Sequence, residues 1–141
     1  PYYLTPFTNA TLSKRTREKY DVVILDPPAF TKSRSTIEMQ NLDKRPDMIK
    51  DDAHIENYDT IFLGFPIWWY VAPTIINTFL ESNDFSHKKI VLFATSGGSG
   101  FGRTVTHLRL SVPDSTKLLE GKLLKPNISI DELKKWAESY E

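Results

Sequence analysis

The chain has 141 residues, with 18 basic and 18 acidic side chains, no cysteine and a formal net charge of zero. A neutral chain has no overall field that would attract nucleic acid or an anionic membrane surface, so we expect neither as a partner. The absence of cysteine excludes disulfides, thiolate nucleophiles and iron–sulfur centres, so any redox chemistry would need a bound cofactor.

Three short elements and one buried strand are predicted in the N-terminal quarter. The segment from Tyr2 to Thr8 mixes aromatic and β-branched residues and predicts a short strand, in which Pro6 favours an edge because it lacks an N–H donor. A hydroxyl-rich turn over residues 8–13 and a short helix over residues 14–20 follow. Residues 21–26 enclose Val-Val-Ile-Leu, an apolar run typical of a strand buried on both faces of a parallel sheet.

A polar segment and a strand–helix unit come next. Residues 31–52 show neither the period of a strand nor that of a helix, so we predict a long loop, of the kind that serves a site or is mobile. Residues 60–65 predict a buried strand that ends at Pro66. The helix predicted over residues 73–81 begins with a proline, which suits a first turn. Its core-facing residues are Ile75, Ile76, Phe79 and Leu80.

The same alternation continues towards the C-terminus. Residues 89–94 predict another buried strand, residues 103–111 a helix, and residues 117–119 a last short strand. The core-facing side of that helix is expected to carry Val105, Leu108 and Leu110. A final helix is predicted after Ser129, because Ser129 and Glu132 have the spacing of a capping box. Its core-facing residues are Leu133, Trp136 and Tyr140.

Strands that alternate with helices predict an α/β fold of three layers (α/β/α), in which helices cover both faces of a parallel sheet. We expect one domain over residues 1–141, since domains commonly contain about 100–150 residues. No apolar run reaches the roughly 20 residues of a membrane helix, and nothing at the start resembles a signal peptide, so the expected location is the cytoplasm. Ligands of such folds bind at the carboxyl ends of the strands, which here lead into two unusual loops.

Large rings follow the strand at residues 60–65. The loop contains Pro66, Ile67, Trp68, Trp69 and Tyr70, and neighbouring side chains in such a stretch cannot all face the core. A ring that faces the crevice can stack on a flat heteroaromatic ligand, which contributes about 0.5–1.5 kcal/mol per ring pair beyond area burial. The alternative is that both tryptophans pack beneath the polar segment 31–52. We favour ligand contact.

Four glycines follow the strand at residues 89–94. The loop consists of Thr95, Ser96, Gly97, Gly98, Ser99, Gly100, Phe101 and Gly102. Without Cβ atoms, its backbone N–H groups can approach a ligand closely. The loop matches neither the phosphate loop that ends in Lys-Ser or Lys-Thr nor the dinucleotide fingerprint. A flexible turn is the alternative, but the position directly after a buried strand favours contact with a cofactor.

The hydroxyl-rich turn near the N-terminus is a candidate phosphate site. Thr8, Asn9, Thr11 and Ser13 could bind an anion together with backbone N–H groups at a helix N-terminus, but an ordinary helix cap explains the same residues equally well. The three histidines, His54, His87 and His107, lack metal-ligand spacing and are more simply surface residues. We therefore expect neither a metal nor a catalytic side chain.

Five sequence motifs between residues 33 and 140 together resemble those of a known family. They are S-R-S-T-I-E-M at 33–39, R-P at 45–46, the strand, aromatic loop and helix at 58–81, F-A-T-S-G-G-S-G at 93–100 and E-G-K-L-L at 120–124. The chain resembles the flavodoxin-like family, in its short bacterial branch of FMN proteins. The resemblance implies a five-stranded parallel sheet in the order 2-1-3-4-5, and FMN with its ring between loops 66–70 and 95–102.

The first 32 residues depart from that family pattern. Members open with an apolar strand and a loop like S-x-T-G-x-T around the FMN phosphate, whereas F-T-N-A-T-L-S stands at 7–13 and lacks the glycine. Residues 20–34 are also similar to the D-P-P segment of class I S-adenosylmethionine-dependent RNA methyltransferases. The glycine-rich loop and acidic strand end that such an enzyme needs are not found upstream.

The resemblance implies an FMN-binding redox protein that either transfers electrons to a partner protein or reduces a small acceptor such as a quinone. The neutral charge favours the second use, because many flavodoxin electron carriers dock through an acidic surface. Whether the chain is an enzyme, and whether it forms a homodimer, both stay open. The alternatives are a cofactor-free flavodoxin-like binding domain and, less favoured, a methyltransferase fragment with its methyl donor at Asp26, Pro27 and Pro28.

Overall fold

The computed structural model describes residues 4–6, 20–25, 41–48 and 54–140. Its strands are β1 (Leu4–Pro6), β2 (Tyr20–Leu25), β3 (Thr60–Pro66), β4 (Lys89–Thr95) and β5 (Lys117–Leu123). Its helices are the short 3-10 helix η1 (Ile55–Asn57), α3 (Thr74–Glu81), α4 (Thr104–Arg109) and α5 (Ile130–Glu138). None of the helices in these described ranges is long and apolar enough to cross a membrane.

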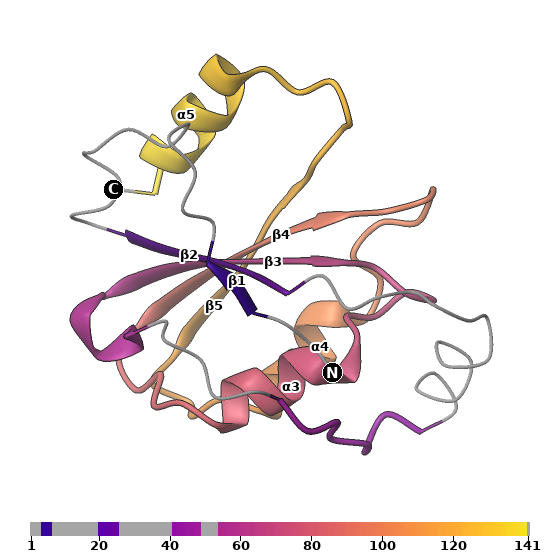
Figure 1. The fold of residues 1–141 in the computed structure, drawn as a ribbon, viewed down its shortest axis with the longest axis vertical. Coiled ribbons are helices and arrows are strands. Elements are labelled where there is room, and N and C mark those ends of the chain that lie inside the picture. The colour runs from indigo at the N-terminus through magenta and orange to yellow at the C-terminus, as the bar shows by residue number, and fades with distance from the viewer. Residues whose placement is uncertain (1–3, 7–19, 26–40, 49–53, 141) are drawn as a thin grey trace.

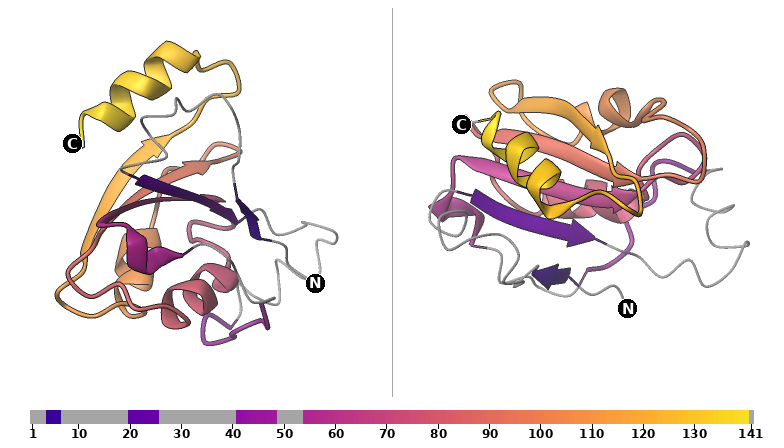
Figure 2. Two further views of the ribbon diagram at one scale, coloured as in Figure 1. Left: turned by 60° about the vertical axis from the view of Figure 1, so that its left-hand side comes forward. Right: turned by 90° about the horizontal axis from the view of Figure 1, so that it is seen from above.

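The sheet lies between two helical layers, with α3 and α4 on one face and α5 on the other (Figures 1 and 2). Alternate residues of β3 serve the two faces, because successive side chains of a strand point to opposite sides. Ile61 and Leu63 belong to the larger core under α3 and α4, whereas Phe62 packs with Trp136 of α5. Burial on both faces explains why β3 and β4 read as continuous apolar runs. The predicted α/β fold of three layers is confirmed.

The order of the N-terminal strands differs from the expected 2-1-3-4-5. The five-stranded sheet has the order β1-β2-β3-β4-β5, with β2 to β5 parallel and β1 antiparallel to β2. The expectation of a fully parallel sheet in which the first strand lies beside β3 was therefore wrong. The apolar run of β2 suits the interior position beside β3, whereas Pro6 in β1 lacks an N–H donor and suits an edge.

The predicted helices are largely where the sequence placed them. Ile75, Ile76 and Phe79 of α3 are completely buried, as expected. In α4, Leu108 is also buried, but Leu110, which caps the C-terminal end of the helix, is 82% exposed, so the expectation that it faces the core was wrong. Two residues after Leu108, a side chain points to the opposite side of a helix, about 200° round.

The C-terminal helix α5 starts as its sequence predicts. The Ser129 side chain accepts a hydrogen bond from the Glu132 N–H, and the Glu132 side chain accepts one from the Ser129 N–H, which completes the capping box. Trp136 and Tyr140 pack on the sheet through edge-to-face contacts with Phe62. The cap and these rings together fix the second helical layer.

Strand β5 is longer than predicted and contains an irregularity. The pairing register with β4 shifts between Leu92 and Phe93, which face Glu120 and Lys122, so Gly121 is the extra residue of the bulge. A side chain at Gly121 would collide with the Leu92 carbonyl oxygen. The sequence pattern predicted only residues 117–119, because glycine and charged residues interrupt the apolar run beyond them.

Candidate functional site

Two loops leave the sheet at the same level, at the carboxyl ends of β3 and β4. Pro66 at the end of β3 is in register with Thr95 at the end of β4. One residue further on, the Ile67 N–H donates a hydrogen bond to the Thr95 carbonyl oxygen over 2.8 Å. The aromatic loop and the glycine loop therefore start side by side, as their positions after adjacent parallel strands predict.

The aromatic loop forms a tight two-residue turn. The backbones of Trp68 and Val71 exchange two hydrogen bonds, of 2.9 and 3.2 Å, on either side of Trp69 and Tyr70. Both central residues have positive φ angles, 51° for Trp69 and 69° for Tyr70, as in a type I′ turn. Asparagine and glycine dominate such positions, because a larger side chain strains the backbone there. Here the strained positions carry the rings.

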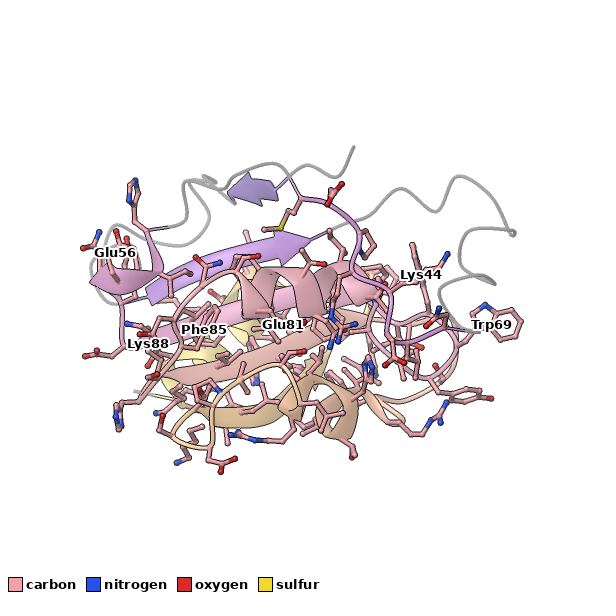
Figure 3. The ribbon with its side chains drawn as sticks, turned by 90° about the horizontal axis from the view of Figure 1, so that it is seen from below. Lys44, Glu56, Trp69, Glu81, Phe85 and Lys88 are labelled. Atoms are coloured by element: carbon pink, nitrogen blue, oxygen red, sulfur yellow. The ribbon has the colours of Figure 1, made fainter. Side chains whose placement is uncertain are left out.

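These rings point outward. Trp69 is 54% exposed and Tyr70 59% exposed, whereas Ile67 and Val71 on either side are buried. Trp68 is half-buried. Figure 3 shows Trp69 pointing away from the ribbon, at the end of the molecule where Lys44 lies and opposite Glu56 and Lys88. The alternative in which both tryptophans are packed beneath another segment therefore does not describe Trp69.

The glycine loop presents bare backbone. Apart from the adjacent residues in the chain, no atom lies within 4 Å of the place that a Cβ would take on Gly97, Gly98 or Gly100. Within the described part of the chain, the N–H groups of Gly97 and Gly100 have no hydrogen-bond partner. The Ser96 hydroxyl braces the loop, since it lies 3.0 Å from the Ser99 hydroxyl and accepts a hydrogen bond from the Gly98 N–H.

The two loops meet again before α4 begins. The Arg103 N–H donates to the Tyr70 carbonyl oxygen over 2.9 Å. Phe101 is buried and its carbonyl oxygen accepts hydrogen bonds from the hydroxyl and the N–H of Thr104. An anchored loop with exposed rings thus lies beside an open loop in which two backbone N–H groups have no partner in the part of the chain that the structure describes.

The structure brings together the residues predicted in loops 66–70 and 95–102. The other predicted group, Thr8, Asn9, Thr11 and Ser13, lies outside the described residues, as do Asp26, Pro27 and Pro28. Among the described residues, no group of three His, Asp or Glu side chains could hold a metal ion.

A polar anchor between the segment 41–48 and α3 was missed by sequence reasoning. In the segment 41–48, the Arg45 guanidinium lies 2.5 Å from the Glu81 carboxylate, and the Thr78 hydroxyl donates to the Pro46 carbonyl oxygen over 3.0 Å. Glu81 also accepts a hydrogen bond from Ser111. These contacts fasten the segment to α3 and connect α3 with the residues after α4. In the sequence, the R-P pair at 45–46 served only as a motif of the family resemblance.

One histidine lies beside this anchor. Burial, followed by the positive charge of Arg45, lowers the pKa of His107 from its ordinary value of 6.5, although Leu42 and Asp43 oppose the shift. Its Nδ1 atom is buried and has no partner among the described residues. His107 therefore favours the neutral form, and is not the plain surface residue that its sequence context suggested.

The comparison with protein families decides which family this is. The family described as Flavodoxin matches residues 15–140. The chain belongs to the flavodoxin family. The match includes residues 20–34, the segment that also resembled methyltransferases. Among curated proteins, none matches the chain.

Solved structures of flavoproteins are similar to this chain. A candidate flavoprotein of Bacteroides uniformis is 39% identical, with a TM-score of 0.66 over 76% of this chain and 67% of its own. A candidate flavoprotein of Bacteroides eggerthii is 34% identical, with a TM-score of 0.65 over 96% of this chain and 75% of its own. A flavoprotein of Lactobacillus acidophilus, solved in complex with FMN, shares the fold at 23% identity, with a TM-score of 0.54 over 74% and 66%.

Proposed function

We propose that this chain binds FMN between its two loops and acts as a redox flavoprotein. One observation carries the proposal: the exposed rings of Trp69 and Tyr70 lie at the same carboxyl end of the sheet as a glycine loop in which the N–H groups of Gly97 and Gly100 have no partner among the described residues. The rings are suited to stacking on a flat tricycle. The N–H groups of Gly97 and Gly100 are suited to the polar edge of the same tricycle, because no side chain blocks them.

The proposed contacts divide between the ring and the phosphate of FMN. The ring contacts are Pro66, Ile67, Trp68, Trp69, Tyr70, Thr95, Ser96, Gly97, Gly98, Ser99, Gly100, Phe101 and Gly102. For the phosphate we propose Thr8, Asn9, Thr11 and Ser13, which would supply hydroxyl, amide and backbone donors. The flavodoxin family and the FMN complex of the Lactobacillus relative support FMN over other flat ligands.

FMN, once bound, would supply the transfer of one or two electrons. The protein contributes position and environment. The buried residues Ile67, Val71 and Phe101 form an apolar base under the loops and exclude water from that side. Backbone donors and stacked rings then bias the stability of one redox state over another. No side chain has to move a proton, so the proposal names no catalytic residue.

A titration tests the binding. The purified protein is stripped of ligand and titrated with FMN while tryptophan fluorescence is recorded, because a flavin stacked on Trp69 quenches it. Riboflavin, which lacks the phosphate, is titrated in parallel. Tighter binding of FMN than of riboflavin supports a phosphate site, and equal binding argues against one. The variant Leu110→Gln, at an 82% exposed side chain away from the loops, is the matched control.

A protein that neither retains flavin nor responds to FMN in this titration overturns the proposal. It would then be the cofactor-free binding domain of the same family. If FMN binds, the flavin is reduced chemically and mixed with a soluble quinone under anaerobic conditions. Reoxidation by the quinone at a rate that saturates with its concentration supports reduction of a small acceptor, whereas reoxidation only by a protein partner supports electron transfer.

A further inference from the structure

The last glycine of the glycine loop contacts the aromatic turn with no room for a side chain. Gly102 has a φ angle of 56°, in the region that favours glycine. A Cβ added there would lie 2.5 Å from the Tyr70 carbonyl oxygen and 2.7 Å from the Tyr70 Cβ. Backbone atoms cannot swing aside as the end of a long side chain can, so any residue other than glycine must displace the turn.

The next residue bonds to the same peptide. The Arg103 N–H donates to the Tyr70 carbonyl oxygen over 2.9 Å, and α4 begins at Thr104. The start of this helix therefore holds the aromatic turn by a hydrogen bond and a close contact at one point. The glycine makes the hydrogen bond possible, because it lets the two backbones approach.

The turn needs such support. Non-glycine residues at positive φ cost about 1–3 kcal/mol each and persist only where surrounding contacts fix them. Within the turn, the Trp68–Val71 hydrogen bonds close the loop. These bonds do not by themselves set how the turn is oriented relative to the glycine loop, whereas the contact at Gly102 and Arg103 does.

We propose that Gly102 is a positioning residue, which fixes the aromatic turn against the start of α4 and so sets the direction of the Trp69 and Tyr70 rings. The two loops then behave as one unit across the cofactor site. The effect on the rings concerns the free protein, while the effect on FMN rests on the proposed function.

Two variants test the contact. Gly102→Ala adds a Cβ at a positive φ, and Gly102→Asn adds a Cβ with a side chain that tolerates this φ. If close approach matters, both variants lower the urea midpoint and change the near-ultraviolet circular dichroism of the aromatic rings, and both weaken FMN binding about threefold to tenfold, as expected from loss of one stacked ring. Normal spectra and affinity for Gly102→Asn would contradict the proposal.

The same loop offers a matched control for the free protein. Apart from its neighbours in the chain, Gly100 has no atom within 4 Å of its added Cβ, and it lacks a positive φ, so Gly100→Ala should leave the urea midpoint and the aromatic spectrum unchanged. Leu110→Gln is the control for FMN affinity. If Gly100→Ala changes the spectrum as much as Gly102→Ala does, the effect is not specific to the contact with Tyr70 and the proposal fails.

A double variant provides the decisive readout. Tyr70→Gly removes the Cβ nearest to Gly102 and relaxes the backbone of the turn. We expect the loss in urea midpoint caused by Gly102→Ala to be clearly smaller in the Tyr70→Gly background than in the wild type. Additive losses would show that neither the Tyr70 Cβ nor the strained backbone at Tyr70 is coupled to Gly102, and would contradict the proposal.

The two proposals fail separately. If the wild type does not bind FMN, the proposed function is wrong, while the spectra and urea midpoints still decide whether Gly102 positions the turn. If the wild type binds FMN and Gly102→Ala loses stability with unchanged affinity and spectrum, Gly102 is merely structural and the inference is overturned. Should Gly102→Ala not fold, Gly102→Asn carries the same comparison.

Discussion

The two loops of the candidate site lie at the carboxyl ends of adjacent strands but differ in what they expose, since one presents aromatic rings and the other presents backbone. The aromatic turn bears large rings at Trp69 and Tyr70 although their φ angles favour glycine or asparagine, whereas half of the residues in the glycine loop are glycines, three of which leave their backbone open. The turn is held by backbone hydrogen bonds on both sides, and the glycine loop by the buried Phe101 and the Ser96 hydroxyl. Aromatic rings can stack on a ligand in a defined direction only if their backbone is fixed, whereas backbone N–H groups can bind a ligand only if no side chain covers them.

The largest effect is expected where the glycine loop is anchored. Phe101→Ala removes a ring that is only 6% exposed and should lower the free energy of unfolding by about 3–5 kcal/mol. Urea denaturation measures the loss. Phe101→Leu, which keeps most of the volume, should lose less than about 1.5 kcal/mol. Equal losses would mean that the ring does not anchor the loop through packing.

A smaller loss is expected inside the glycine loop. Gly98 has a φ angle of 147°, which L residues rarely adopt, so Gly98→Ala should destabilise the fold by about 1–3 kcal/mol although space is available. Gly97→Ala meets neither a positive φ nor a neighbour and should change stability by less than about 0.5 kcal/mol. Thermal unfolding of both variants compares them, and a difference near zero would show that the loop adapts freely.

The aromatic turn can be tested at one position with two replacements. Trp69→Asn and Trp69→Val both remove the ring, but asparagine tolerates the φ of 51° and a β-branched residue does not. We expect the asparagine variant to be more stable by about 1–2 kcal/mol. Both variants should weaken FMN binding to a similar degree. A valine variant as stable as the asparagine variant would show that the backbone at residue 69 is not strained.

The smallest effect concerns His107, which lies beside the anchor formed by Arg45 and Glu81. Because burial lowers the pKa of His107 below 6.5, the unfolded chain binds a proton more readily than the folded one as the pH falls through this value. The contribution of His107 to stability is therefore complete above pH 6.5 and lost as the pH falls towards its folded pKa. His107→Gln should flatten the slope of the unfolding free energy as the pH falls through the ordinary histidine pKa of 6.5. An unchanged slope would show that the pH dependence of stability comes from other titratable groups.

Much of this site follows from local signals in the sequence. The apolar runs before Pro66 and Thr95 predicted both strands, and adjacent parallel strands predicted that their loops would meet. The Ser129 and Glu132 spacing predicted the start of α5, because the two residues bond to each other's backbone. The apolar runs and the capping box depend only on neighbours in the chain, and the meeting of the two loops follows from the general geometry of parallel strands.

Other features depend on partners that are distant in the chain. Nothing near Arg45 shows that its guanidinium pairs with Glu81, 36 residues away. The close approach of Gly102 to Tyr70 cannot be predicted from the sequence either, because nothing distinguishes Gly102 from the other glycines of its loop. The strand order was wrong because the family pattern was extended over residues that depart from it, and Pro6 alone already favoured an edge.

The bulge at Gly121 has a consequence for aggregation. Strand β5 is the last in the sheet, and an outer strand offers unpaired backbone groups to any other molecule with a similar strand. The extra residue twists this strand, and the charges of Glu120 and Lys122 flank the twist. Straight, continuous pairing with a second molecule is thereby hindered, so concentrated solutions of the protein should not form intermolecular β-structure along this side.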